Sequence, residues 1–160
     1  MGVAYGLRFT GSEPKITNNI FITSNNTNQA AIYCEGTAPE DEIVLENNLF
    51  LRYSSSGLRF PAYIACNGDT LETSAELESS SELDADNNLV SSTTDVSDLV
   101  NVLDEANHYE LISGSATGDS LSPLNNGQDA DDEDLGSVTY DIFGVVRTVG
   151  SYDIGAHEFE

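Results

Sequence analysis

One acidic segment near the C-terminus has the residue types and spacing of a cation site. Asp129, Asp131 and Glu133 lie two positions apart along it, which is the spacing of alternate ligands in a cation-binding loop. Carboxylate oxygens are the ligands that Ca²⁺ prefers in proteins. The segment lacks the central glycine and the terminal bidentate Glu of an EF-hand, so we expect at most weak Ca²⁺ binding. We expect no cofactor to be required.

Other familiar catalytic patterns are missing from the sequence. His108 and His157 are isolated, and there is no Gly-x-Ser-x-Gly elbow, phosphate loop or dinucleotide fingerprint. Many carboxylates are present, but nothing singles out the pair that an inverting glycoside hydrolase needs. The sequence therefore argues against a serine hydrolase, a zinc enzyme or a nucleotide-dependent enzyme, and it favours a non-catalytic protein.

Net charge narrows the range of partners. The 160 residues include 28 Asp and Glu but only 5 Lys and Arg, which gives a formal net charge of −23 at pH 7. Nucleic acids and anionic membranes bind through basic patches that neutralise phosphate, so we expect neither as a partner. Cations and neutral sugars suit such a surface better. The chain also lacks an apolar run long enough to span a membrane.

An internal repeat determines the expected architecture. An Asn-Asn pair followed by two apolar residues occurs at residues 18–21, 47–50 and 87–90. Gly-Leu-Arg-Phe occurs at residues 6–9 and again at 57–60, with Ala-Ile-Tyr-Cys about halfway between them. These spacings indicate a period of about 25 residues.

Each period consists of short strands joined by polar turns. Runs rich in strand-forming residues, such as residues 20–23 and 42–45, are bounded by Asn, Gly, Ser and Asp, and helical periodicity is nearly absent. Such short strands cannot bury their own apolar faces, so each should pair in parallel with its equivalent one period later. The sequence predicts an all-β fold, a solenoid of about three to four coils with irregular C-terminal strands.

The Asn-Asn pairs mark a recurring bend in the predicted coils. Asn tolerates a left-handed backbone conformation, and its side-chain amide can donate to and accept from the same amide one coil away. We therefore expect Asn18, Asn47 and Asn87 to form a structural ladder rather than a ligand site.

The chain length suits a single domain, residues 1–160. Residues 1–68 contain the regular coils, and residues 69–108 are predicted to be an irregular acidic coil or excursion because Ser, Glu, Asp and Thr dominate there. A short helix is predicted at about residues 97–106, where apolar residues recur at helical spacing. Residues 109–160 close the domain.

Cys34 and Cys66 match no zinc or redox spacing, which is typical of a buried pair of thiols. They occupy similar places in neighbouring coils, so a disulfide between them is the alternative for an exported protein. The sequence leaves both alternatives open.

The C-terminal segment resembles a known family. It contains Asp-x-x-Gly-x-x-Arg at residues 141–147 and Asp-Ile-Gly-Ala-x-Glu at residues 153–158, after a Ser-Pro turn and a Gly turn. These motifs are similar to the closing motif of bacterial secreted and surface proteins with a choice-of-anchor Q type C-terminus. The resemblance is specific over residues 109–158. It implies a right-handed, pectate-lyase-like parallel β-helix outside the cell or at its surface, and no particular reaction. Residues 1–5 do not match the pattern of a signal peptide, so for an exported protein we expect the signal to lie upstream or to have been replaced by Met1.

Arg147 is the central residue of that motif. Its guanidinium can make bidentate, charge-assisted hydrogen bonds to carboxylates such as those of Asp141, Asp153 and Glu158. We expect these four residues to be a structural clasp that holds the last coils together.

Arg8 and Arg59 occupy the same position in the two Gly-Leu-Arg-Phe copies. Coils stack about 4.8 Å apart, so two coils would place these side chains about 10 Å apart on one face. We expect both to be candidate carbohydrate contacts, although plain solvation of the two charges fits the sequence equally well.

The leading functional hypothesis is a non-catalytic extracellular β-helix module for carbohydrate or surface interaction. The alternative is a truncated or divergent polysaccharide lyase or glycoside hydrolase of the pectate-lyase-like superfamily. Three or four coils barely provide the long groove of such enzymes, which favours the module. The first coil has no amphipathic helix before it, and uncapped strand edges invite pairing, so we also expect a homodimer through this N-terminal coil.

Overall fold

The computed structural model describes residues 4–24, 29–37, 43–53, 61–90, 103–104, 110–111 and 146. Within them the chain passes three times through three strands. The first passage contains β1 (Ala4–Phe9), β2 (Lys15–Thr17) and β3 (Ile20–Ser24). The second contains β4 (Gln29–Cys34), β5 (Ile43–Glu46) and β6 (Leu49–Tyr53). The third contains β7 (Tyr63–Ile64), β9 (Leu83–Asp86) and β10 (Leu89–Val90).

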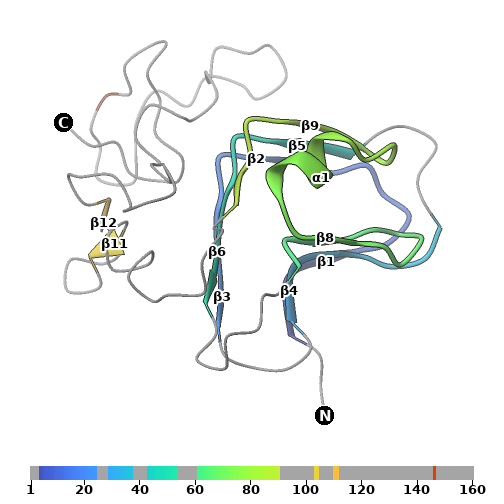
Figure 1. Cartoon of the computed structure of the whole chain (residues 1–160), viewed down its shortest axis with the longest axis horizontal. Helices are drawn as coiled ribbons and strands as arrows, with labels where there is room; N and C mark the ends of the chain where they lie inside the picture. The colour runs from blue at the N-terminus through green and yellow to red at the C-terminus, as the bar shows by residue number, and fades with distance from the viewer. Residues whose placement is uncertain are drawn as a thin grey trace.

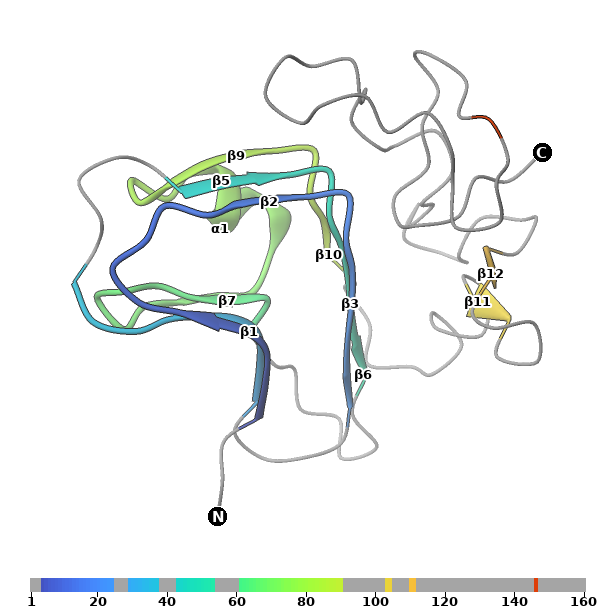
Figure 2. The same ribbon diagram turned by 180° about the vertical axis from the view of Figure 1, so that it is seen from behind.

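Equivalent strands of successive passages pair in parallel and form three sheets. Their strand orders are β1-β4-β7, β2-β5-β9 and β3-β6-β10, with the short β8 (Thr70–Leu71) added antiparallel to β7. Figures 1 and 2 show the three sheets as three sides around a common interior. The all-β prediction and the predicted parallel pairing are both confirmed.

The distance along the chain between paired strands increases from passage to passage. Leu7 pairs with Ile32, 25 positions later, whereas Ile32 pairs with Tyr63, 31 positions later. Val44 pairs with Asp84, 40 positions later. The predicted period of about 25 residues therefore holds for the first step of one sheet only, because longer connections are inserted afterwards.

The third passage corrects the predicted irregular stretch after residue 68. Strands β9 and β10 continue the parallel pairing to residue 90, and only β8 and α1 (Ser74–Glu78) depart from it. Leu71, Leu77 and Leu83 come from β8, α1 and β9 in turn, and each packs into the interior. Their six-residue spacing fits neither a helix nor a strand because each belongs to a different element.

Helix α1 is short and is the only helix in the described part of the chain. It begins with a capping box, in which Glu76 N donates to Thr73 Oγ1 and Thr73 N donates to a Glu76 carboxylate oxygen. No helix among the described residues is long and apolar enough to cross a membrane. The prediction of a helix at residues 97–106 is wrong for two of its residues. Leu103–Asp104 form the strand β11, which pairs antiparallel with β12 (Glu110–Leu111). The rest of that range lies outside the described residues.

The first Asn of each pair makes the predicted left-handed bend. The φ angles of Asn18, Asn47 and Asn87 are 57°, 52° and 52°. An L-residue adopts this conformation at a cost that is smallest for Gly and Asn, which explains why Asn recurs there.

The side-chain ladder is formed by the second Asn of each pair, which corrects the prediction. Asn19 Nδ2 donates to Asn48 Oδ1 at 3.2 Å, and Asn48 Nδ2 donates to Asn88 Oδ1 at 3.0 Å. The backbone N–H groups of Asn19 and Asn48 donate to the same two oxygens. Asn48 and Asn88 are buried, so the ladder lies inside the corner between two sheets.

The interior of the three passages is apolar. Ile32, Leu45 and Tyr63 are fully buried, and Phe21 stacks on Phe50 with ring centroids 5.1 Å apart. Burying one large apolar side chain stabilises a fold by roughly 1.5–3 kcal/mol, so these side chains supply the main driving force for stacking.

Among the three ladder residues, Asn48 is the one whose side chain should contribute most to the free energy of unfolding. Asn48→Ala would remove the side-chain donor to the carbonyls of Ile16 and Glu46 and the acceptor of the Asn19 N–H, while the Glu46 carbonyl keeps the Asn18 N–H as a donor. We expect the free energy of unfolding to fall by about 2–4 kcal/mol, because each orphaned buried group costs about 1–3 kcal/mol. Urea denaturation measures this loss. Asn19→Ala, at the exposed end of the ladder, is the matched control and should lose less than about 1 kcal/mol; equal losses would contradict a buried ladder.

Candidate functional site

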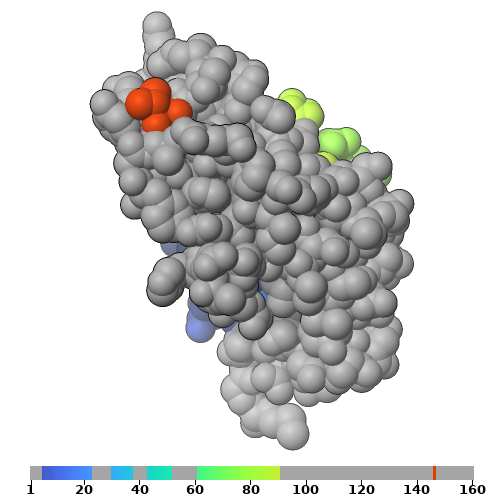
Figure 3. Space-filling model, turned by 90° about the vertical axis from the view of Figure 1, so that its left-hand side faces the viewer, coloured from blue at the N-terminus to red at the C-terminus, as the bar shows by residue number. Residues whose placement is uncertain are grey.

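Of the predicted site residues, Arg8 is the one that the structure describes. Asp129, Asp131 and Glu133, the clasp residues Asp141, Arg147, Asp153 and Glu158, and Arg59 all lie outside the described residues. Val146, next to Arg147, is 62% exposed and is the orange patch in Figure 3. The predicted calcium site and clasp therefore stay predictions.

The strand register corrects the predicted equivalence of Arg8 and Arg59. Arg8 pairs with Tyr33, and Tyr33 pairs with Ile64. The residue two passages from Arg8 is thus Ile64, because the connection between β4 and β7 is longer than the one between β1 and β4. The repeated Gly-Leu-Arg-Phe phrase does not mark equivalent strand positions.

Alternation along the strands turns Arg8 and Tyr33 toward the outer face. Their neighbours Leu7 and Ile32 pack in the interior, and successive side chains of a strand point to opposite faces. Arg8 is exposed and Tyr33 is partly buried. The outer face of this sheet therefore carries an aromatic ring beside a cation.

Four side chains form a connected cluster around Tyr33, which we call the Tyr33 platform: Tyr5, Arg8, Tyr33 and Glu35. The rings of Tyr5 and Tyr33 stack with centroids 4.6 Å apart and planes at 25°. The Arg8 guanidinium carbon lies 6.0 Å from the Tyr33 ring centroid, within cation–π range. Arg8 Nε also donates to Glu35 Oε2 at 3.1 Å, and Arg8 Nη2 contacts the same oxygen.

The Arg8–Glu35 pair is about half exposed, with side-chain accessibilities of 54% and 45%. Its hydrogen bond and charge attraction to Glu35 raise the pKa of Arg8, so the guanidinium stays cationic. Solvent screens such a pair, and its contribution to stability is small. The pair instead holds exposed N–H donors of Arg8 and carboxylate acceptors of Glu35 in place beside the Tyr33 ring.

A second cluster lies at the end of the same sheet. Cys34 of β4 and Cys66, two residues after β7, form a disulfide with their Cα atoms 4.7 Å apart. Of the two alternatives left open by the sequence, the structure contains the bonded pair. Parallel pairing of β4 with β7 brings the two residues together across 32 positions of chain.

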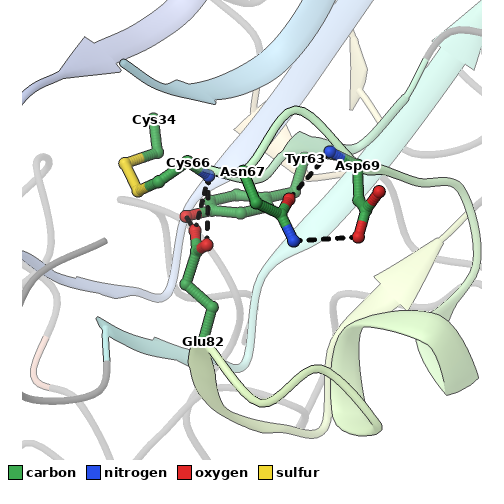
Figure 4. Close-up of a disulfide and its surroundings, with 6 residues drawn as sticks. All are labelled: Cys34, Tyr63, Cys66, Asn67, Asp69 and Glu82. Atoms are coloured by element: carbon green, nitrogen blue, oxygen red, sulfur yellow. Dashed lines mark hydrogen bonds between the residues drawn. A yellow bond between two sulfur atoms is a disulfide. The ribbon is translucent and has the colours of Figure 1, made fainter. Parts of the chain in front are cut away.

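Glu82 reaches the disulfide from the segment before β9 (Figure 4). Its Oε1 accepts from the Tyr63 hydroxyl at 2.7 Å and from Cys66 N at 2.9 Å, and its Oε2 accepts from Cys66 N at 3.0 Å. Sequence reasoning missed Glu82, which is one of many acids in an acidic stretch. Glu82 meets Tyr63 and Cys66 only in the folded chain, because 19 and 16 positions separate them.

The folded structure shifts the pKa of Tyr63, which is hydrogen-bonded to Glu82. Burial raises its pKa well above the usual range, and the hydrogen bond to Glu82 and the carboxylate charge raise it further. The phenol therefore stays neutral and acts as a donor to Glu82. Beyond Cys66, the turn is held by Asp69 N donating to Asn67 Oδ1 at 2.8 Å.

Tyr63→Phe should destabilise the fold at neutral pH and less so at alkaline pH. The variant removes the hydroxyl donor to Glu82 Oε1, which then keeps only the Cys66 N–H among the described groups, and this loss costs about 1–2 kcal/mol. A folded-state pKa above the unfolded value gives stability that is complete below about pH 10 and declines above it, by about 1.4 kcal/mol per pH unit for one phenol. Tyr63 causes this loss of stability in the wild type, and the variant lacks it. The difference between their free energies of unfolding should therefore shrink between about pH 8 and pH 11.

Urea unfolding of both proteins at the two pH values measures the effect. Tyr33→Phe, a phenol on the outer face, is the matched control. A Tyr63→Phe deficit that is the same at both pH values would contradict the assigned linkage.

No protein-family model, curated protein or solved structure matches this chain, so its function has to be inferred from its own side chains and their contacts.

Proposed function

We propose that this chain is a short right-handed parallel β-helix module that binds a neutral carbohydrate on the Tyr33 platform without transforming it. The observation that carries the proposal is the stacked pair of Tyr5 and Tyr33 with the Arg8–Glu35 pair at its edge. The three passages through parallel-paired strands support the β-helix.

Carbohydrate suits this surface because each part of the platform matches a part of a sugar. The face of an aromatic ring is electronegative and attracts the weakly positive C–H groups of a pyranose. Arg8 supplies N–H donors and Glu35 supplies carboxylate acceptors, which sugar hydroxyls can bridge. Aromatic side chains also lose little conformational entropy on binding.

Charge makes a neutral ligand preferable to an acidic one. The chain has a formal net charge of −23, which repels a polyanionic polysaccharide. Arg8 does not counter this repulsion, because its charge is already compensated by Glu35.

The composition of the platform favours binding over hydrolysis. Its four residues include a single carboxylate, and that carboxylate is paired with Arg8. An inverting glycoside hydrolase needs two carboxylates about 6.5–9.5 Å apart, one of them protonated. The truncated lyase or hydrolase remains the second proposal, and release of reducing or unsaturated sugar ends would favour it.

An extracellular or cell-surface location is part of the proposal. A structural disulfide is typical of oxidising compartments, and Cys34–Cys66 is buried on one side in the apolar interior. The resemblance of residues 109–158 to secreted and surface β-helix proteins supports the same location.

We also propose that two copies associate through the N-terminal end. Strands β1, β2 and β3 each form the edge of their sheet, so their outward N–H and C=O groups have no strand partner in the described part of the chain. The end is marked by the exposed Asn19 and by Ile22, which is 41% exposed. Exposed edges of this kind pair readily with another chain.

Ile22→Lys should convert the proposed dimer to a monomer, because a charge on an edge strand opposes edge-to-edge pairing. Light scattering coupled to size exclusion measures the mass at micromolar concentrations. A wild-type protein that is monomeric under these conditions would exclude this interface.

Tyr33→Ala and Arg8→Ala should each weaken glycan binding about tenfold, the equivalent of 1.4 kcal/mol. Affinity electrophoresis against a panel of neutral and acidic polysaccharides, followed by calorimetry with the best ligand, measures the loss. Lys15→Ala removes an exposed cation from a different sheet and is the matched control for Arg8→Ala. Retention of acidic glycans alone, or unchanged binding by Tyr33→Ala, would refute the platform.

A further inference from the structure

Three side chains that can ligate a soft metal converge beside Tyr63. The Sγ atoms of Cys34 and Cys66 and a carboxylate oxygen of Glu82 all lie within 4.8 Å of one another. Cys34 is buried, whereas Cys66 and Glu82 are partly buried, so the cluster has one solvent-facing side. Figure 4 shows the Glu82 carboxylate beside the disulfide, directed at the Cys66 backbone nitrogen and the Tyr63 hydroxyl.

A tetrahedral site requires a wider spacing of the two sulfur atoms than the disulfide gives. With metal–sulfur bonds of about 2.3 Å and metal–oxygen bonds of about 2.0–2.2 Å, tetrahedral ligand atoms lie about 3.5–3.8 Å apart. The two sulfur atoms would have to separate to that distance from their bonded position. Rotation of the Cys66 side chain on the solvent side can supply this movement while the paired backbones stay in place.

We propose that this cluster is a redox-gated site for a thiophilic divalent cation such as Zn²⁺, formed when the Cys34–Cys66 disulfide is reduced. Two thiol groups of an external reductant would be oxidised to a disulfide while the protein disulfide accepts two electrons and two protons. Binding of the cation to the two sulfurs would then release those two protons to solvent. Glu82 contributes the third ligand without proton release, because it binds as a carboxylate.

The carboxylate is held in place for this role before any metal arrives. Tyr63 and Cys66 N position Glu82, and Oε2 accepts one hydrogen bond among the described residues, which leaves it a lone pair for a metal. Fixing of a ligand by such outer contacts is a regular property of metal sites.

The ligand set also predicts which cations are refused. Two thiolates and one carboxylate favour zinc and similarly soft ions, whereas Ca²⁺ and Mg²⁺ require oxygen ligands. Three protein ligands leave a fourth position for water or another donor. The intact disulfide offers no thiolate, so oxidation closes the site.

Titration with Cd²⁺, a spectroscopic substitute for Zn²⁺, tests the proposal on the whole chain. A trialkylphosphine is the reductant, because it takes oxygen from water to form its oxide and, unlike a dithiol, does not compete strongly for Cd²⁺. We expect one equivalent of Cd²⁺ to produce the ultraviolet thiolate-to-cadmium band in the reduced protein and no band in the oxidised protein. Excess Ca²⁺ should not reduce the band.

Glu82→Gln is the decisive variant, because the amide keeps the shape and loses the anionic ligand. We expect at least a tenfold weaker affinity for Cd²⁺. Glu35→Gln, an exposed carboxylate on the outer face, is the matched control and should bind as the wild type does. Circular dichroism of each disulfide form verifies the fold, and Glu82→Ser is used in the same way if the amide does not fold.

Three results would overturn the proposal. The first is absence of the band in the reduced wild type. The second is equal Cd²⁺ affinity of the wild type and the Glu82 variant, which would reduce the site to a simple dithiol. The third is loss of the β-sheet spectrum on reduction even with Cd²⁺ present, since the site requires the strands to hold without the disulfide.

Discussion

The amide ladder through Asn48 is the interaction on which the rest of the structure depends. Its side chain joins three passages of the chain, because it accepts from Asn19 and donates to Asn88 and to the carbonyl of Ile16. A buried amide tolerates little displacement, since any shift would leave carbonyls and N–H groups without partners. The ladder therefore holds two of the sheets in a single register at the corner where they meet.

Register has consequences for every side chain on the strands. A slip of one residue would exchange the inner and outer faces, because the side-chain period of a strand is two. In the observed register Ile32 and Tyr63 lie in the interior, whereas Arg8 and Tyr33 lie outside. The same parallel pairing that buries the core thus assembles the Tyr33 platform from two different passages of the chain.

The connections between strands, in contrast, vary freely in length. The segment between β7 and β9 contains β8 and α1, and Leu77 of α1 returns an apolar side chain to the interior. That same segment delivers Glu82 to Cys66 and Tyr63. Stacked strands accept such excursions at low cost, because loop closure becomes only slowly more expensive with length. The connections therefore supply additional side chains such as Glu82, and the paired strands keep the same arrangement in each passage.

The sequence by itself determined the elements that depend on neighbouring residues. Short apolar runs predicted the strands, Asn-Asn pairs predicted the left-handed bends at Asn18, Asn47 and Asn87, and the need to bury one face predicted parallel stacking. Only the tertiary structure determined that Asn19, Asn48 and Asn88 make the ladder, that Arg8 is aligned with Ile64 and not with Arg59, and that Glu82 faces a disulfide. The physical reason is that local propensity is set within a few residues, whereas partners across passages depend on how many residues loop out between strands. The spacing of 40 positions between the second and third Asn-Asn pairs equals the step from β5 to β9, whereas the steps of 25 and 31 positions in the β1-β4-β7 sheet match no repeated motif.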